Sequence, residues 1–451
     1  MAQPLILGLG QTGLSLVAHF SRLGQRPLVA DTRSAPPLAK ELKRTHPDVE
    51  LLRVEEIEPG RQTLSSVWAS PGFPLHHPVL EQLRCQGLSI DNDIELFARE
   101  LAAANKGARV LAVTGTNGKS TVCAMLGHAL TQAGIRTQVA GNIGLPIAQL
   151  LARPLDAQVY VLELSSFQLT YVHSLAGHSG CILNLAEDHL DHHGSHNEYA
   201  AAKQRIYTTS EAQIVNADDP ATWATGKDHS DNRYWFGLNN KPPHGRTERF
   251  AGCEQGQLYF GARKLLHKES LPDSTEHNLL NTLAAMALLA SINRLDVAMH
   301  LASYSHLPHR CQALGEKLGR WFVNDSKATN PHAAIHSMQG MAKQYKKLVV
   351  IAGGDAKGIA LDTLGAAIRR HCRALVVMGK DGAALARVCQ GMPIHQATNM
   401  QQALNSALAL SEPGDCITLC PGCASTDMYA DYTYRGDAFM TLVANLNGEA
   451  G

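Results

Sequence analysis

The sequence has no charge excess of either sign. Its 451 residues include 40 Lys and Arg and 40 Asp and Glu, so the formal net charge is zero. Without an overall basic excess the chain has no general means of holding a polyanion, and any phosphate site must be local. Long hydrophobic runs are also missing, since none approaches the roughly 20 residues that span a bilayer. We therefore expect neither a nucleic acid nor a membrane among its partners.

Disulfide and secretion signals are missing as well. The ten cysteines lack the dense, regular spacing of a disulfide framework. The first residues carry no basic segment and reach Gly8 and Gly10 at once, unlike a signal peptide. The remaining composition, 45% hydrophobic and 18% charged residues, is that of a globular chain. We expect a reduced, cytoplasmic protein that is a monomer.

Three stretches of the chain alternate short apolar runs with helical patterns, which predicts α/β structure with parallel sheets. The expected strands are residues 5–9, 27–30, 67–69, 109–113, 158–163, 181–184, 213–216, 321–324, 347–352, 374–378 and 416–420. Helices are expected at residues 13–22, 119–133 and 278–295, the last capped by Ser274, Thr275 and Glu276, and short antiparallel strands and loops at 217–275. We predict a Rossmann-like N-terminal domain (1–98), a P-loop ATPase-like central domain (99–305) and a Rossmann-like C-terminal domain (306–451).

The most specific motif is Gly115-Thr-Asn-Gly-Lys-Ser-Thr121, between an expected strand and an expected helix. Backbone N–H groups at a helix N-terminus bind phosphate, and the helix macrodipole favours negative charge there. Lys119 would reach the β- and γ-phosphates, and the Ser120 hydroxyl would coordinate Mg²⁺. The strict Gly-x4-Gly-Lys-Ser/Thr pattern is not met, because Val113 occupies the position where the pattern requires its first glycine. A glycine-capped turn without a ligand is the alternative.

Two later strand ends offer metal ligands. Glu163 ends an expected strand, and next to a phosphate loop it favours metal coordination over a solvated charge. Residues 187–193, Glu-Asp-His-Leu-Asp-His-His, suggest zinc but lack its usual ligand spacing. One imidazole could join a magnesium shell, while His192, His193 and His196 fit solvated loop positions.

Two further motifs have more than one interpretation. Gly8-Leu-Gly-Gln-Thr-Gly13, with Asp31 eighteen residues later, matches a dinucleotide fingerprint and suits either NAD or a UDP-linked substrate. Cys420-Pro-Gly-Cys423 could be a redox or zinc pair. No second pair occurs at a matching spacing, which favours packing cysteines beside a turn.

Taken together, the motifs resemble the Mur ligases, ATP-dependent amino-acid-adding enzymes of bacterial cell-wall synthesis. The motifs that carry the resemblance run over essentially the whole chain: residues 115–121, 141–144, 163–169, 184, 187–191, 203, 277–278, 281, 309–310 and 324–330. Residues 8–15, 31–33, 70–72, 93–97, 353–357 and 423–427 are similar to the branch of the family that adds D-glutamate.

The resemblance implies a ligase that adds D-glutamate to UDP-N-acetylmuramoyl-L-alanine through an acyl phosphate, in peptidoglycan precursor synthesis, with ATP and two Mg²⁺ ions. The implied ATP-binding residues are Gly115, Thr116, Asn117, Gly118, Lys119, Ser120, Thr121, Asn278, Arg310 and Asp325. The implied metal ligands are Ser120, Glu163, His189 and Lys203, the last carbamylated by CO₂ because an ammonium cannot ligate a metal. Lys119, His189 and Lys203 are the implied catalytic residues.

The resemblance also implies the sites of the other two substrates. Asp31, Thr32, Gly72 and Asn142 would hold the UDP-linked substrate, and Thr329, Lys357, Ser425 and Tyr432 the D-glutamate. Tyr432 departs from the pattern, since the related enzymes carry Phe near this position. Three other functions stay open at this point: a folylpolyglutamate-synthase-like ligase, an NAD-binding oxidoreductase, and a nucleotide-sensing module without turnover.

Overall fold

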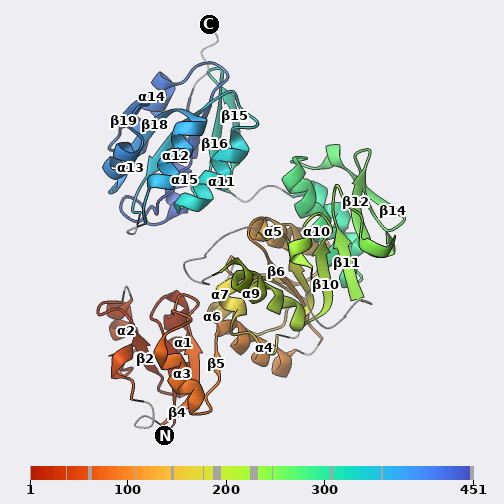
Figure 1. Ribbon diagram of the computed structural model, residues 1–451, viewed down its shortest axis with the longest axis vertical. Helices are drawn as coiled ribbons and strands as arrows, with labels where there is room; N and C mark the ends of the chain where they lie inside the picture. The colour runs from red at the N-terminus through yellow and green to blue at the C-terminus, as the bar shows by residue number, and fades with distance from the viewer. Residues whose placement is uncertain are drawn as a thin grey trace. The chain divides into compact units, whose positions relative to one another are not determined.

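The computed structural model describes residues 2–36, 38–58, 63–105, 107–143, 147–175, 177–185, 195–223, 232–245, 247–304, 308–356 and 359–446. The chain divides into two compact units, residues 1–305 and residues 306–451 (Figure 1). The first unit contains both regions that the sequence assigns to separate domains, 1–98 and 99–305. The boundary between them stays a prediction.

The first sheet is parallel throughout. Among the described residues it has five strands in the order β3-β2-β1-β4-β5: β1 (Gln3–Leu7), β2 (Leu28–Asp31), β3 (Leu51–Arg53), β4 (Leu64–Ala69) and β5 (Ile90–Asp91). Its helices are α1 (Gln11–Arg22), α2 (Ala39–Thr45), α3 (Pro78–Cys85) and α4 (Asp93–Ala104). The strand order reverses between β1 and β4, and ligands bind outside the carboxyl ends of strands at such a point.

The second sheet, also in the first unit, has nine strands within the described ranges, in the order β14-β13-β12-β11-β10-β9-β6-β8-β7. The strands are β6 (Arg109–Thr114), β7 (Thr137–Gly141), β8 (Val159–Glu163), β9 (Gly177–Ile182), β10 (Ser210–Asn216), β11 (Arg233–Phe236), β12 (Phe250–Glu254), β13 (Gln257–Phe260) and β14 (Arg263–His267). Its helices are α5 (Lys119–Gln132), α6 (Ile147–Leu150), α7 (Ser166–Leu169), α9 (His196–Thr208), α10 (Glu276–Ser291) and the 3₁₀ helix η7 (Leu295–Ser303).

One expectation for this sheet needs correction, and a second is confirmed in position only. Residues 217–275 are not purely antiparallel, because β11 and β12 extend the parallel sheet, and in the described part of this segment the antiparallel pairs are β12–β13 and β13–β14. The predicted position of the α10 cap is confirmed, because Thr275 is the N-cap residue, but its side chain makes no cap hydrogen bond. Instead the Thr275 N–H donates to the Asp273 carboxylate at 2.8 Å.

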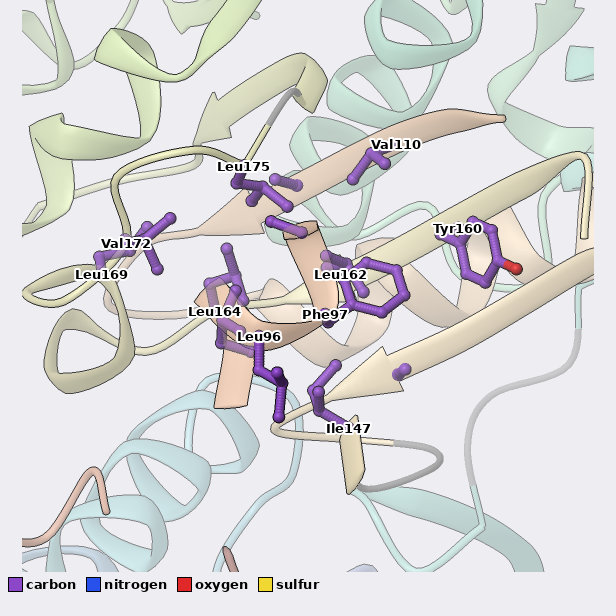
Figure 2. Close-up of a cluster of buried hydrophobic side chains, with 14 of the residues drawn as sticks. Leu96, Phe97, Val110, Ile147, Tyr160, Leu162, Leu164, Leu169, Val172 and Leu175 are labelled. Atoms are coloured by element: carbon purple, nitrogen blue, oxygen red, sulfur yellow. The ribbon is translucent and has the colours of Figure 1, made fainter. Parts of the chain in front are cut away.

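A buried apolar cluster anchors α4 to the second sheet (Figure 2). The Phe97 ring meets the Tyr160 ring edge-on, with centroids 5.3 Å apart, and Leu96 and Leu162 belong to the same cluster. Full burial of one such side chain contributes about 1.5–3 kcal/mol. Since α4 directly follows β5, this cluster holds the first sheet and the second sheet together in one unit.

The second unit has one mixed sheet. In its described part six strands lie in the order β15-β16-β20-β17-β18-β19, with β15 antiparallel to β16 and the other neighbours parallel. The strands are β15 (Gln312–Lys317), β16 (Arg320–Asn324), β17 (Leu348–Gly353), β18 (Cys372–Met378), β19 (Ile394–Gln396) and β20 (Cys416–Leu419). The helices are α11 (Pro331–Met341), α12 (Asp362–His371), α13 (Gly382–Val388), α14 (Met400–Leu410) and α15 (Tyr432–Ala444).

Two other features bear on the expectations from composition. All ten cysteines are free, and Cys420 and Cys423 are buried in a core cluster of the second unit, as packing residues would be. A search of the described residues for a helix long and apolar enough to cross a membrane finds none.

Candidate active site

The phosphate loop joins β6 to α5, and α5 begins at Lys119. Gly115 and Gly118 have φ angles of +147° and +83°, which residues with a Cβ atom rarely adopt. The Lys119 ammonium turns back over the loop, where Nζ donates to the carbonyl oxygens of Gly115 (2.9 Å) and Thr116 (2.7 Å). The loop therefore presents a helix N-terminus with a cation beside it.

The loop is held in place by residues from β9 and α10. Asn184 accepts from the Asn117 N–H (2.8 Å) and donates to the Asn117 carbonyl (3.1 Å), so its amide clamps the turn from the end of β9. On the other side, a Cβ at Gly118 would collide with Asn281, whose side chain also donates to Asn278 at 3.1 Å. The start of α10, with Asn278, thus lies against the phosphate loop.

Glu163 lies at the end of β8 and is 2% exposed. Its Oε1 accepts from the Asn142 side chain at 3.0 Å, while Oε2 has no hydrogen-bond partner among the described residues. Gly141 allows this approach, because a Cβ there would overlap the Glu163 carbonyl oxygen. A buried carboxylate oxygen without a donor fits a hard cation such as Mg²⁺.

The described residues contain no group of three or more His, Cys, Asp and Glu that could hold a metal ion by themselves. A cation at Glu163 would need oxygen ligands from elsewhere. Ser120, which is buried at the start of α5, and phosphate oxygens of a nucleotide are such ligands. His189 lies outside the described residues.

Lys203 projects from α9 and is 2% exposed. Its Nζ donates to the Gly115 carbonyl (2.9 Å) and lies 3.3 Å from Thr114 Oγ1 and 4.7 Å from the centre of the Tyr199 ring. The Tyr199 hydroxyl in turn bonds Thr116 Oγ1 at 3.1 Å. Sequence reasoning missed Thr114 and Tyr199. The spacing between Tyr199 and Lys203, one turn of a helix, is the signal that could have found the tyrosine.

The N-terminal glycine motif forms a second tight turn, between β1 and α1. A Cβ at Gly13 would overlap the Gly8 carbonyl oxygen, so the helix packs directly on the turn. Asp31, at the end of β2, accepts from the Leu9 N–H (2.7 Å) and from the Arg33 guanidinium (2.8 Å). Burial by itself would raise the pKa of Asp31, but these hydrogen bonds outweigh it and hold the pKa below its usual value.

A cavity of about 760 Å³ in the first unit brings the two turns together. The strand-end loops of the first sheet and the start of α4 contribute one wall, and Lys119 of the phosphate loop, the end of β7, the start of α6, the α7 turn and α9 contribute the rest. Of the predicted site residues, the lining includes Asp31, Thr32, Gly72, Lys119, Asn142 and Lys203.

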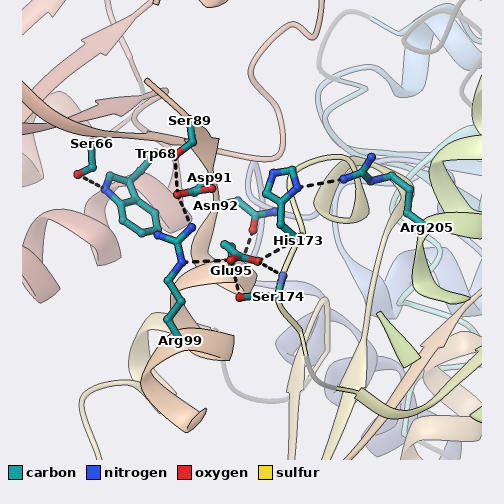
Figure 3. A network of polar contacts seen from close by, with 10 residues as sticks. All are labelled: Ser66, Trp68, Ser89, Asp91, Asn92, Glu95, Arg99, His173, Ser174 and Arg205. Carbon is teal, nitrogen blue, oxygen red and sulfur yellow. Dashed lines mark hydrogen bonds and ion pairs between the residues drawn. The ribbon is translucent and has the colours of Figure 1, made fainter. Parts of the chain in front are cut away.

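A polar network fixes the α7 turn that lines this cavity (Figure 3). The Asn92 side chain donates to the Gln168 carbonyl at 2.7 Å. The Glu95 carboxylate accepts from the backbone N–H groups of His173 (2.8 Å) and Ser174 (2.9 Å) and from Arg99 (3.1 Å). Burial tends to raise the pKa of Glu95, but these donors lower it overall. Sequence reasoning assigned these residues no role.

The remaining predicted residues belong to the second unit. Asp325 follows β16, is 2% exposed and accepts from the Cys311 N–H at 3.0 Å, and burial raises its pKa. Arg310 is close enough for its charge to oppose that rise. Thr329 follows in the same loop, Ser425 lies in the loop after β20 and Tyr432 begins α15. Lys357 lies outside the described residues.

Comparison with known proteins decides the family. Three family profiles match: a Mur ligase MurD-like N-terminal domain at residues 2–91, a Mur ligase middle domain at 113–289 and a Mur ligase glutamate ligase domain at 309–423. The chain is 38% identical over 449 residues to the UDP-N-acetylmuramoylalanine–D-glutamate ligase of Marinobacter nauticus, covering 98% of both chains. The chain belongs to the Mur ligase family.

Two further relatives agree with this assignment. The UDP-N-acetylmuramoylalanine–D-glutamate ligase of Thiobacillus denitrificans is 39% identical over 463 residues, covering 98% of this chain and 96% of the relative. The crystal structure of UDP-N-acetylmuramate–alanine ligase from Thermotoga maritima has a TM-score of 0.56 at 17% identity, covering 99% and 100% of the two chains, and shows the shared fold. The predicted α/β fold class with three Mur ligase domains, and the prediction of an ATP-dependent ligase, are confirmed.

Proposed function

We propose that this Mur ligase joins D-glutamate to UDP-N-acetylmuramoyl-L-alanine, in the cytoplasm, for peptidoglycan precursor synthesis. The observation that carries the proposal is the shared cavity: Lys119 and Lys203 line it together with Asp31, Thr32 and Gly72. A substrate held by its UDP group at the first sheet can therefore extend a carboxylate toward the phosphate loop. The names of the full-length relatives support the same substrates.

The proposed reaction has two steps, formation of an acyl phosphate and then of the amide. The alanyl carboxylate attacks the γ-phosphorus of ATP, the bond to the bridging oxygen breaks, and ADP leaves. The amine of D-glutamate then attacks the acyl carbon, loses a proton, and expels inorganic phosphate to leave an amide. Two anions must meet in the first step, so the site has to supply positive charge there. Lys119 and the N-terminus of α5 supply it.

Magnesium would add to this charge when bound, by screening the phosphate oxygens that the carboxylate approaches. Ser120 and Glu163 would hold one ion, because Glu163 Oε2 is a buried acceptor without a partner in the described residues. His189 and Lys203 would hold a second ion. Lys203 would do so as a carbamate, since an ammonium has no lone pair to offer.

The other predicted residues would complete the ATP and amino-acid sites. In the first unit, residues 115–121 and Asn278 would contact ATP, and Asn142 would contact the UDP-linked substrate while orienting Glu163. In the second unit, Arg310 and Asp325 would contact ATP, and Thr329, Lys357, Ser425 and Tyr432 would bind D-glutamate.

Phosphate release tests the function directly. Purified protein is incubated with Mg²⁺, ATP, UDP-N-acetylmuramoyl-L-alanine and D-glutamate, and each substrate is omitted in turn. We expect sustained release only in the complete mixture, with a product whose mass equals the two substrates joined with loss of water. Release that ignores an omission, or a complete mixture that yields no extended product, would refute the proposal.

Labelled bicarbonate tests the lysine modification separately. With ¹³C-bicarbonate, a carbamate carbon signal is expected from the wild-type chain and not from Lys203→Met. Lys264→Met, on β14, serves as the matched control and should keep the signal. An identical signal in Lys203→Met would place the carbamate elsewhere, without bearing on the ligase reaction.

A further inference from the structure

Arg435 is a buried cation that the sequence motifs did not single out. It lies in the first turns of α15 and is 2% exposed. Charged side chains are seldom buried so completely unless an opposite charge pairs with them. In the described part of the chain, however, Arg435 makes no ion pair with a carboxylate.

Within the described residues, the hydrogen bonds of its guanidinium go to neutral acceptors. Nε donates to Ser326 Oγ (3.0 Å), Nη2 to the Ser326 carbonyl (3.0 Å), and Nη1 to the Cys423 carbonyl (3.1 Å). Asp427 is the carboxylate whose charge acts on Arg435, but it accepts from the Lys380 N–H at 2.8 Å instead. Burial accordingly lowers the pKa of Arg435 to about 10.

These hydrogen bonds join two loops of the second unit, and a third loop lies against the same guanidinium. Ser326 belongs to the loop after β16 and Cys423 to the loop after β20. Gly354 begins the third loop, directly after β17, and a Cβ there would lie 3.3 Å from Nη1 of Arg435. The loops after β17 and β20 also bond each other, through paired N–H to carbonyl bonds of 2.9 Å between Asp355 and Ala424.

The same loops carry the residues proposed to bind D-glutamate. Thr329 follows Ser326 by three residues, and Ser425 follows Cys423 by two. Tyr432 is tied in as well, because its carbonyl accepts from Ser326 Oγ at 2.7 Å. The Arg435 guanidinium beneath these loops hydrogen-bonds neutral acceptors within the described residues, so its charge can attract an anionic ligand.

We propose that Arg435 is a positioning residue of the amino-acid site: it holds the loops after β16, β17 and β20 together, and its charge favours an amino acid with two carboxylates over one with a single carboxylate. This inference rests on the proposed function. It adds a residue that does not touch the substrate but determines which charge the site prefers.

Charge and shape can be separated with two substitutions. Arg435→Lys keeps the charge and loses the planar fork, whereas Arg435→Gln removes the charge and keeps hydrogen-bonding groups. The readout is kcat/KM for D-glutamate relative to D-glutamine, which replaces the side-chain carboxylate with an amide of similar shape. KM for ATP and for UDP-N-acetylmuramoyl-L-alanine is measured alongside.

We expect Arg435→Gln to raise KM for D-glutamate, and to reduce the preference for D-glutamate over D-glutamine, at least about tenfold, the size of one charge–charge interaction across a protein interior. Its KM for the other two substrates should stay within about twofold. Arg435→Lys should keep most of the preference. The matched controls are Arg373→Gln and Arg373→Lys, because Arg373 is in the same unit but pairs with Asp415 at 2.7 Å. The control variants should keep wild-type preference.

Three results would overturn the inference. An equal preference for D-glutamate over D-glutamine in Arg435→Lys and Arg435→Gln would show that the charge does not select the amino acid. A parallel change in all three KM values would indicate general damage to the fold. Loss of cooperative thermal unfolding in both variants would assign Arg435 to stability alone. Failure of the proposed function differs from all three, because the wild-type chain would then form no product.

Discussion

Lys203 donates a hydrogen bond from Nζ to the Gly115 carbonyl at 2.9 Å, across 88 residues of sequence. The helix that carries Lys203 is thereby fixed to the phosphate loop. Tyr199, one turn earlier, places its ring 4.7 Å from the same nitrogen and its hydroxyl against Thr116. The loop, the lysine and the tyrosine form one contact group, so a change in any of them should affect phosphoryl transfer.

Comparing Tyr199→Phe with Tyr199→Leu separates the contribution of the Tyr199 hydroxyl from that of its ring. Phe keeps the ring over Lys203 and loses the bond to Thr116, whereas Leu loses both. We expect a modest fall in kcat for Phe, about two- to fivefold for one neutral hydrogen bond, and a clearly larger fall for Leu, which also removes the ring that packs against the Lys203 side chain. Steady-state kinetics measures both. A Leu variant as active as the Phe variant would show that the ring does not matter.

Lys119→Met should remove the cation that folds over the phosphate loop. We expect phosphate release to fall at least about a hundredfold, as when a donor to a developing anionic charge is removed. Thermal unfolding should change little, since Lys119 is only partly buried. Lys264→Met, at an exposed position of β14, is the control and should keep full activity. Activity above a tenth of wild type in Lys119→Met would contradict the assigned role.

Gly141→Ala should destabilise the chain and displace Asn142 from Glu163. Gly141 has φ of +104°, and a Cβ would overlap the Glu163 carbonyl oxygen, so strain and steric overlap add. We expect a loss of about 2–4 kcal/mol in the free energy of unfolding, measured by denaturant titration. The control is Gly134→Ala, with φ of +74° and open space around its Cβ, which should lose only about 1 kcal/mol. Equal losses would mean that the close approach is unimportant.

Asp93 should make stability depend on pH in an unusual direction. It is 4% exposed, lines the cavity, and has one carboxylate oxygen without a partner among the described residues. Burial raises the pKa of Asp93 from 3.8 to about 6. The folded state thus holds the proton more tightly than the unfolded state, and stability falls as pH rises from about 4 to 6.

Asp93→Asn tests this directly, because the neutral amide has the same shape. We expect the variant to be more stable than wild type at pH 7.5, by on the order of 3 kcal/mol, with the gain vanishing near pH 4.

Asp31→Asn should change stability in the opposite direction. Hydrogen bonds hold the pKa of Asp31 below its usual value, so this variant should lose stability at pH 7.5, and the loss should fade as pH falls through the folded-state pKa. Denaturant titration at several pH values measures both variants.

Much of the architecture is visible in the sequence because it depends on local patterns. The strands around residues 5–9, 109–113 and 347–352 are short apolar runs that end in glycine or a polar turn, and the structure has β1, β6 and β17 there. Short edge strands such as β3 and β19 are not distinctive, since they have few buried residues to mark them. The parallel pairing of β11 with β10 and β12 joins separate strands, and the residue pattern within a strand does not record the direction of its partner.

The sequence by itself determined the family, the phosphate loop and the ligase class, because contiguous motifs such as residues 115–121 carry both the backbone geometry and the chemical groups that phosphate requires. Only the tertiary structure decided which distant residues meet: Tyr199 and Thr114 with Lys203, Asn184 with Asn117, and Arg435 with the loops at Ser326 and Cys423. The reason is physical. A hydrogen bond or a buried charge gains its energy from the partners and solvent exclusion that folding supplies, and neither is present in the linear chain.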